Sequence, residues 1–215
     1  MTRNTLAEKI IHACLEMSRL GLNQGTAGNI SVRYQEGMLI TPSGIAYEKM
    51  NAGQIVYVNA SGESEEGKIP SSEWRFHQAA YQVRPDLNAV VHNHAPHCTA
   101  VAILNLPIPA IHYMIAAAGG NTIPCVPYAT FGSVELSVNV AAALRDRKAT
   151  LLQHHGMIAC EVNLEKALWL AQEVEVLARL YLAVSGRVHP VPVLSEEEIN
   201  VVLERFKHYG LRVEE

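Results

Sequence analysis

Three short apolar runs follow one another closely near the start of the chain and limit the folds available to it. They span residues 30–34, 38–41 and 55–58, and the first two gaps contain Glu36-Gly37 and Pro42-Ser43-Gly44. Such runs, bounded by Gly, Pro and Ser, predict strands joined by turns. The first 60 residues leave no room for repeated βαβ units, so a mostly antiparallel sheet is expected.

Helices are expected on either side of this sheet. Apolar residues recur at helical spacing over 5–20, and a long segment, 163–184, is apolar on most faces, which is typical of a helix buried in the core or between subunits. Serine caps and glutamates in the first turn predict two further helix starts, at Pro70-Ser-Ser-Glu73 and at Ser195-Glu-Glu-Glu198. Two more helices are expected over 95–104 and 134–144, and further strands over 89–94, 149–153 and 157–160. We predict a single α/β domain over residues 1–215, with a central, mostly antiparallel sheet flanked by helices and a mobile tail from about 207 to 215.

The charge and hydropathy of the chain argue against several classes of function. The net charge is −4, so there is no basic excess to follow a nucleic-acid backbone or an anionic membrane. No run approaches the roughly 20 apolar residues of a membrane span, and the first ten residues lack the apolar core of a signal peptide. Four cysteines lie far apart without a CxxC pair. We expect a cytoplasmic protein with reduced thiols and no nucleic-acid or membrane partner.

A group of histidines is the strongest chemical signal. His92 and His94 stand at alternate positions of an expected strand, so both imidazoles would point to one face. His155 follows another expected strand, and three histidines with an open fourth position are typical of a catalytic zinc site. His154 competes with His155 for the third place, because only one of two successive strand residues can face the site. A single histidine on an apolar strand is more often a hydrogen-bonded core residue, and the other histidines are interpreted in that way.

Glu73 and three Gly/Ser segments are weaker candidates. Periodicity alone makes Glu73 an ordinary first-turn glutamate, and the alternative is an acid/base group beside the metal. Residues 25–29, Ser43-Gly44 and Ser71-Ser72 could bind a phosphate through backbone N–H groups, hydroxyls and a helix N-terminus. Each segment by itself could equally be an ordinary turn or cap.

Several motifs taken together resemble the class II aldolase/adducin superfamily. They are NQGTAGNISVR, TPSG, KIPSSEWRFH, VVHNHAPHCTA, IPAIHYM and LLQHHGMIA, and they span nearly the whole chain in order. The resemblance implies a cyclic homotetramer with one Zn²⁺ per subunit on His92, His94 and His155, and with Glu73 close enough to ligate the resting metal. Other positions that match the family's motifs are expected to bind the substrate phosphate: Thr26, Gly28, Asn29, Ser43, Gly44, Ser71 and Ser72. Ser43 stands where threonine is expected in some relatives, a change that keeps the hydroxyl.

The resemblance also implies an activity. The resemblance is strongest to bacterial enzymes of fucose metabolism. These are lyases that reversibly cleave L-fuculose 1-phosphate into dihydroxyacetone phosphate and L-lactaldehyde. Glu73 would move the proton at the nucleophilic carbon, and Tyr113 would protonate or orient the aldehyde oxygen. Tyr113 and Phe131 match positions that shape the active site across a subunit boundary, and Tyr209 matches a tail residue that closes over the substrate.

Three other functions are compatible with the same superfamily. A pentulose-phosphate 4-epimerase uses the same metal, but such enzymes tend to carry aspartate at the position of Glu73. A methylthioribulose-phosphate dehydratase also fits the metal set and would need a pocket for a thioether. An adducin-like binding module would share the fold without chemistry, but such modules lose the metal histidines that this chain retains.

Overall fold

A seven-stranded sheet runs through the middle of the computed structural model, which describes residues 1–187 and 190–207. The strand order is β3-β2-β1-β4-β9-β8-β7, and only the β7–β8 pair is parallel. The strands of this sheet are β1 (Asn29–Tyr34), β2 (Gly37–Ile40), β3 (Val56–Val58), β4 (Ala89–Asn93), β7 (Cys125–Val126), β8 (Ala149–Leu152) and β9 (Gly156–Glu161). Two more short strands, β5 (Ile108–Pro109) and β6 (Thr122–Ile123), pair separately.

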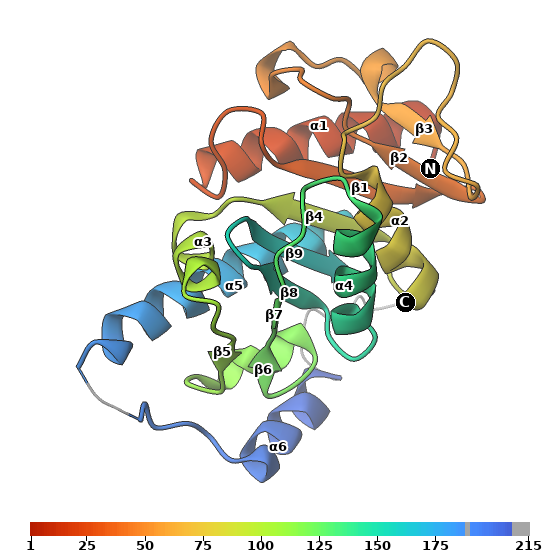
Figure 1. The fold of residues 1–215 in the computed structure, drawn as a ribbon. Helices are drawn as coiled ribbons and strands as arrows, with labels where there is room; N and C mark the ends of the chain where they lie inside the picture. The colour runs from red at the N-terminus through yellow and green to blue at the C-terminus, as the bar shows by residue number, and fades with distance from the viewer. Residues whose placement is uncertain (188–189, 208–215) are drawn as a thin grey trace.

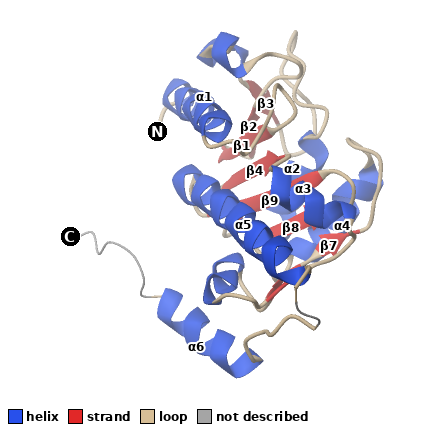
Figure 2. Cartoon of the chain, turned by 90° about the vertical axis from the view of Figure 1, so that its left-hand side faces the viewer, coloured by secondary structure: helices blue, strands red, loops and turns tan. Residues whose placement is uncertain are grey.

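Helices cover both faces of the sheet and give the molecule three layers (Figures 1 and 2). The α-helices are α1 (Arg3–Arg19), α2 (Trp74–Val83), α3 (Pro96–Ile103), α4 (Val134–Leu144), α5 (Leu164–Ser185) and α6 (Glu196–Phe206). Single 3₁₀ turns form η1 (Tyr47–Lys49) and η2 (Ala52–Gln54), and a longer one forms η3 (Tyr113–Ala118). Helices α1, α3 and α5 pack on one face, whereas α2 and α4 pack on the other.

The alternation of side chains along β4 divides the core between these two faces. Val91 is fully buried with α1 and α5, and Val90 is fully buried with α2 and α4. His92 follows at the same phase as Val90, so its ring enters the α2 side of the sheet. The strand therefore delivers an imidazole into the layer where α2 begins.

The predicted fold class is confirmed, and most predicted elements lie within two residues of the observed ones. The predicted start of α2 is wrong. The helix begins at Trp74, Glu73 occupies the cap position without making a side-chain cap hydrogen bond, and the Ser71 hydroxyl accepts from the Glu73 amide in the preceding turn. The Glu73 side chain is thus not used as a helix cap and can turn toward the sheet.

The long helix α5 has more apolar surface than this chain covers. Its inner side is buried against the sheet, but Trp169, Leu180 and Val184 are each about two-fifths exposed.

All four cysteines are free. Across the described ranges, no helix combines the length and apolarity that a bilayer span requires.

Candidate metal centre

Three segments that are distant in the sequence meet at one end of the sheet. The end of β4 carries His92 and His94, the loop joining β8 to β9 carries His155, and the turn before α2 carries Glu73. Strand pairing sets this arrangement, because β4 lies between β1 and β9 and places His92 opposite Asn29 on one side and Ile158 on the other.

The three imidazoles converge on one point. Their ring centroids lie 4.8–5.0 Å apart, and each pair of rings is close to perpendicular. The nitrogens that could bind an ion all lie within 4.8 Å of one another, and the Nε2 atoms of His92 and His94 are 3.2 Å apart. Imidazoles pointing edge-on toward a common centre have the arrangement that a shared cation requires.

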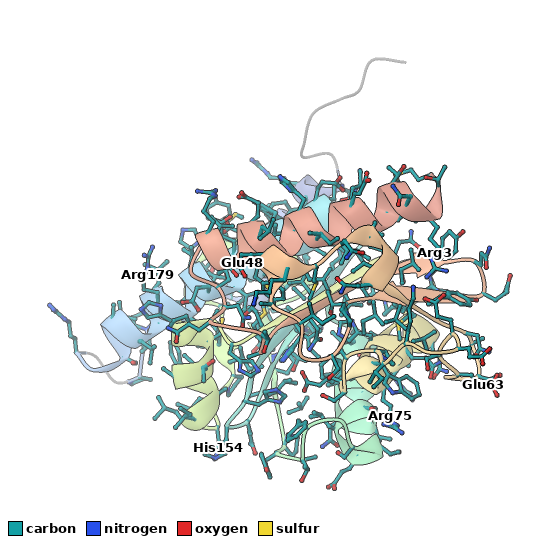
Figure 3. The ribbon with its side chains drawn as sticks, turned by 90° about the horizontal axis from the view of Figure 1, so that it is seen from above. Arg3, Glu48, Glu63, Arg75, His154 and Arg179 are labelled. Atoms are coloured by element: carbon teal, nitrogen blue, oxygen red, sulfur yellow. The ribbon has the colours of Figure 1, made fainter. Side chains whose placement is uncertain are left out.

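The loop conformation, rather than strand alternation, separates His155 from His154. Leu152 pairs with Gly156, so both histidines belong to a three-residue loop. His154 has φ +54°, a left-handed conformation that is uncommon for residues other than glycine, and its side chain is exposed at the periphery (Figure 3). His155 turns inward, and this geometry favours it as the third ligand.

Glu73 faces the same point from the opposite side. Its Oε2 is 3.1 Å from His92 Nε2, and its Oε1 is 3.3 Å from His155 Nε2. The side chain is only 5% exposed, and Oε1 makes no hydrogen bond. A buried carboxylate oxygen without a hydrogen-bond partner is costly, and a cation among the imidazoles would satisfy it.

The protonation states also suit a metal. Burial lowers the pKa of His155 to about 3 and that of His94 to about 4, so both rings are neutral and can offer a lone pair. Burial would raise the pKa of Glu73, but the neighbouring His92 and His155 rings and the Asn29 amide outweigh it and lower that pKa to about 2. The centre therefore offers neutral imidazoles from His94 and His155 and an anionic oxygen from Glu73, beside the His92 ring.

The His92 ring is held in the orientation that ligation needs. Its Nδ1 donates to the Met157 carbonyl at 2.9 Å, and its Nε2 faces the centre. Metal-binding histidines usually donate their second nitrogen in this way. The residues present therefore fit a divalent cation, with room for a further ligand on the cleft side.

Gly156 permits the close approach of the two histidine-bearing segments. A Cβ atom there would lie 2.4 Å from the Asn93 carbonyl oxygen and 2.9 Å from the His94 ring. We expect Gly156→Ala to lower the free energy of unfolding by about 1–3 kcal/mol, because β4 and β9 must separate. Urea denaturation measures this, with Gly186→Ala as the control, since a Cβ meets nothing within 4 Å there. Equal stability of the two variants would contradict the prediction.

The expected phosphate segments lie beside this centre. An isolated bridge between Pro42 and Pro70 and a hydrogen bond from the Ser43 amide to the Ile69 carbonyl bring the Ser43-Gly44 turn alongside the turn at Ser71-Ser72. The Gly25–Gly28 loop is tied down by Tyr47, whose hydroxyl donates to the Gly28 carbonyl at 2.6 Å.

A cleft of about 360 Å³ opens over the centre. It is lined by Thr26, Ala27, Ser72, Glu73, His94, Tyr128, Ala129, Phe131, His154 and His155. Tyr128 was not predicted to line the site, because no local pattern distinguishes it from other loop aromatics. His154 was considered only as an alternative to His155 as the third metal ligand. Tyr113 instead lines a groove against α6, and Tyr209 lies outside the described residues.

Comparison with known proteins places this geometry in a family. The family model described as Class II Aldolase and Adducin N-terminal domain matches residues 8–182. The chain belongs to the class II aldolase and adducin family. It is 75% identical over its full length, and over all of the relative, to "L-fuculose phosphate aldolase" of Escherichia coli O157:H7.

Two further relatives of this family extend the comparison. One, from Escherichia coli O45:K1, is named "5-methylthioribulose-1-phosphate/5-deoxyribulose-1-phosphate aldolase" and is 60% identical, covering 99% of this chain and 100% of the relative. A solved structure titled "L-fuculose 1-phosphate aldolase" superposes with a TM-score of 0.92 at 38% identity, covering 96% of this chain and 98% of the other. The chain is thus a class II, metal-dependent aldolase rather than an adducin-like binding module.

Proposed function

We propose that this aldolase reversibly cleaves L-fuculose 1-phosphate into dihydroxyacetone phosphate and L-lactaldehyde, with one Zn²⁺ per subunit on His92, His94 and His155. The observation that carries the proposal is the convergence of three imidazoles and of Glu73 Oε1, which makes no hydrogen bond, beside an open cleft. Full-length identity of 75% to a curated L-fuculose phosphate aldolase supports the choice of substrate.

The bound metal and Glu73 have separate roles in the proposed reaction. A zinc ion bound at the centre supplies Lewis-acid stabilisation of the negative charge that develops on the substrate's oxygens. Glu73, a carboxylate beside the bound substrate, takes and returns the proton at the nucleophilic carbon. Its side chain makes no cap hydrogen bond to α2 and faces the centre rather than the helix end.

The phosphate would be held at the other end of the cleft. Thr26 and Ser72 line the cleft, and Gly28, Asn29, Ser43, Gly44 and Ser71 lie in the adjoining segments. Contacts to the phosphate are remote from the bond that breaks, so their binding energy fixes the orientation of the reacting carbons.

A neighbouring subunit would complete the site. Phe131 is 64% exposed at the rim of the cleft, and Tyr113 is 51% exposed on η3, where it lines a different groove. We propose that a homotetramer brings Tyr113 of one chain, and the tail residue Tyr209, to the cleft of the next. The exposed apolar side of α5 is consistent with such contacts.

The test is a product assay on protein of known metal content. Incubation of dihydroxyacetone phosphate with L-lactaldehyde should give L-fuculose 1-phosphate, and D-lactaldehyde should react more slowly. A chelator should abolish the reaction and added zinc should restore it. Full activity of the metal-free protein would contradict the proposal, and an epimer or a dehydrated ketone as product would indicate another reaction of the superfamily.

The 60% identical relative raises a second candidate substrate of the same reaction type. The same protein should therefore be offered 5-deoxyribulose 1-phosphate beside L-fuculose 1-phosphate. A higher kcat/KM for the deoxypentulose phosphate would replace the proposed substrate while leaving the metal and proton chemistry unchanged.

A further inference from the structure

A chain of buried hydrogen bonds approaches Glu73 from the side opposite the cleft. Asn29 Nδ2 donates to Glu73 Oε2 at 2.9 Å, and Asn29 Oδ1 lies 2.6 Å from His77 Nε2. The other nitrogen of His77, Nδ1, lies 2.8 Å from Ser31 Oγ, which in turn lies 2.8 Å from the Tyr81 hydroxyl. His77 and Ser31 have no exposed surface, and Asn29 and Tyr81 are 4% and 6% exposed. This series of hydrogen bonds connects β1 with α2 and ends at the metal centre.

Each hydrogen bond in this series is donated in the same direction, from Tyr81 toward Glu73. Glu73 is a carboxylate and can only accept, so Asn29 must present its NH₂ group to Glu73 and its carbonyl to His77. His77 must therefore donate from Nε2. Burial lowers the pKa of His77 to about 3, so the ring is neutral and its Nδ1 is an acceptor that takes the Ser31 hydroxyl proton. The Tyr81 hydroxyl then donates to Ser31.

This direction of donation indicates a function for His77, although its ring does not contact the metal centre. Without a donor at His77, the Asn29 amide could turn over, and its carbonyl would face the Glu73 carboxylate. We propose that His77 is a positioning residue that locks the Asn29 amide, so that Asn29 holds Glu73 Oε2 and leaves Oε1 directed at the metal centre. This inference rests on the proposed function, because it assigns Glu73 its orientation for metal contact and proton transfer.

Three variants separate positioning from simple packing. His77→Phe fills the same space without a donor, His77→Gln restores an N–H donor and an acceptor, and Ser31→Ala removes the hydroxyl that fixes the His77 tautomer. Direct hydrogen-bond partners of metal ligands typically contribute about 10–100-fold, and His77 acts through Asn29, the direct partner of Glu73. We expect His77→Phe to lower kcat by about that factor, Ser31→Ala to lower it a few-fold, and His77→Gln to stay within about fivefold of wild type.

The visible absorption of the cobalt-substituted protein gives a readout that does not depend on turnover. We expect His77→Phe to alter the cobalt bands, because Glu73 loses its fixed orientation, and His77→Gln to keep the wild-type spectrum. Wild-type bands and kcat in both His77→Phe and Ser31→Ala would overturn the proposal. So would equal losses in His77→Phe and His77→Gln, which would indicate that the imidazole itself is required. If His77→Phe does not fold, Ser31→Ala decides: a few-fold lower kcat with altered cobalt bands supports the proposal, and wild-type values of both overturn it.

The two proposals fail in different ways. If wild-type protein forms no dihydroxyacetone phosphate, the proposed function fails, but the cobalt spectra still report whether His77 orients Glu73. If wild type is active and the spectra do not respond to His77, only the positioning role is lost.

Discussion

Glu73→Gln is expected to lower kcat by about 10²–10⁴-fold while leaving the metal content unchanged. That range is the usual contribution of a positioned acid/base group. Glutamine keeps the size of the side chain and can still accept from Asn29 Nδ2, but it cannot take a proton from carbon. The three imidazoles remain to hold the ion. Steady-state cleavage of L-fuculose 1-phosphate and metal analysis of the same sample measure the two quantities.

The matched control is Glu161→Gln. Glu161 is as buried as Glu73, at 6% exposed, but it lies at the far end of β9 and pairs with Lys148. Its amide variant should keep kcat near wild type even if stability falls. Retained turnover in Glu73→Gln would assign the proton transfer to another group, and loss of the metal would make Glu73 chiefly a ligand.

The pair His155→Ala and His154→Ala should have opposite effects on zinc. Removal of His155 takes away one of three converging nitrogens, so metal affinity should fall by more than the roughly 10–100-fold typical of outer-shell partners. Activity at limiting zinc should fall with it. His154→Ala should retain one zinc per subunit, because the His154 side chain is exposed and outside the converging cluster.

Competition with a chromophoric chelator gives the affinity of each variant. The two substitutions affect adjacent residues of one loop, so they test directly which neighbour binds the metal. His154 has φ +54°, a conformation that is unfavourable for alanine, so His154→Ala should lower stability without lowering the zinc content. Loss of zinc in His154→Ala with normal binding in His155→Ala would reverse the ligand assignment.

Local sequence patterns predicted most of the architecture. The turns at Glu36-Gly37 and Pro42-Ser43-Gly44 left only hairpin connections among the first strands, and the sheet is antiparallel there. Helix α4 begins and ends at the predicted residues, because Ser133 caps it and its apolar periodicity is regular. Turn chemistry and periodicity act over a few residues, so the sequence displays them directly.

The start of α2 could not be predicted in the same way. Ser71, Ser72 and Glu73 together carry the signal of a capped helix, but the glutamate has stronger partners across the sheet than at the helix end. The hydrogen bond from the Asn29 amide to the charged carboxylate, a type worth about 1.5–3 kcal/mol, outweighs a first-turn interaction worth under about 1 kcal/mol. A tertiary contact therefore overrode a local preference.

The sequence by itself determined the antiparallel fold, the alternating His92 and His94, and, through its family motifs, the class of chemistry. Tertiary structure alone decided that the hairpin loop turns His155 inward and His154 outward. It also decided that the Glu73 side chain faces the imidazoles rather than the helix end, and that His77 joins buried hydrogen bonds that end at Glu73. The physical reason is range. Periodicity and capping depend on residues that are neighbours in the sequence. A metal centre depends on which strands pair and on how a loop directs two adjacent side chains.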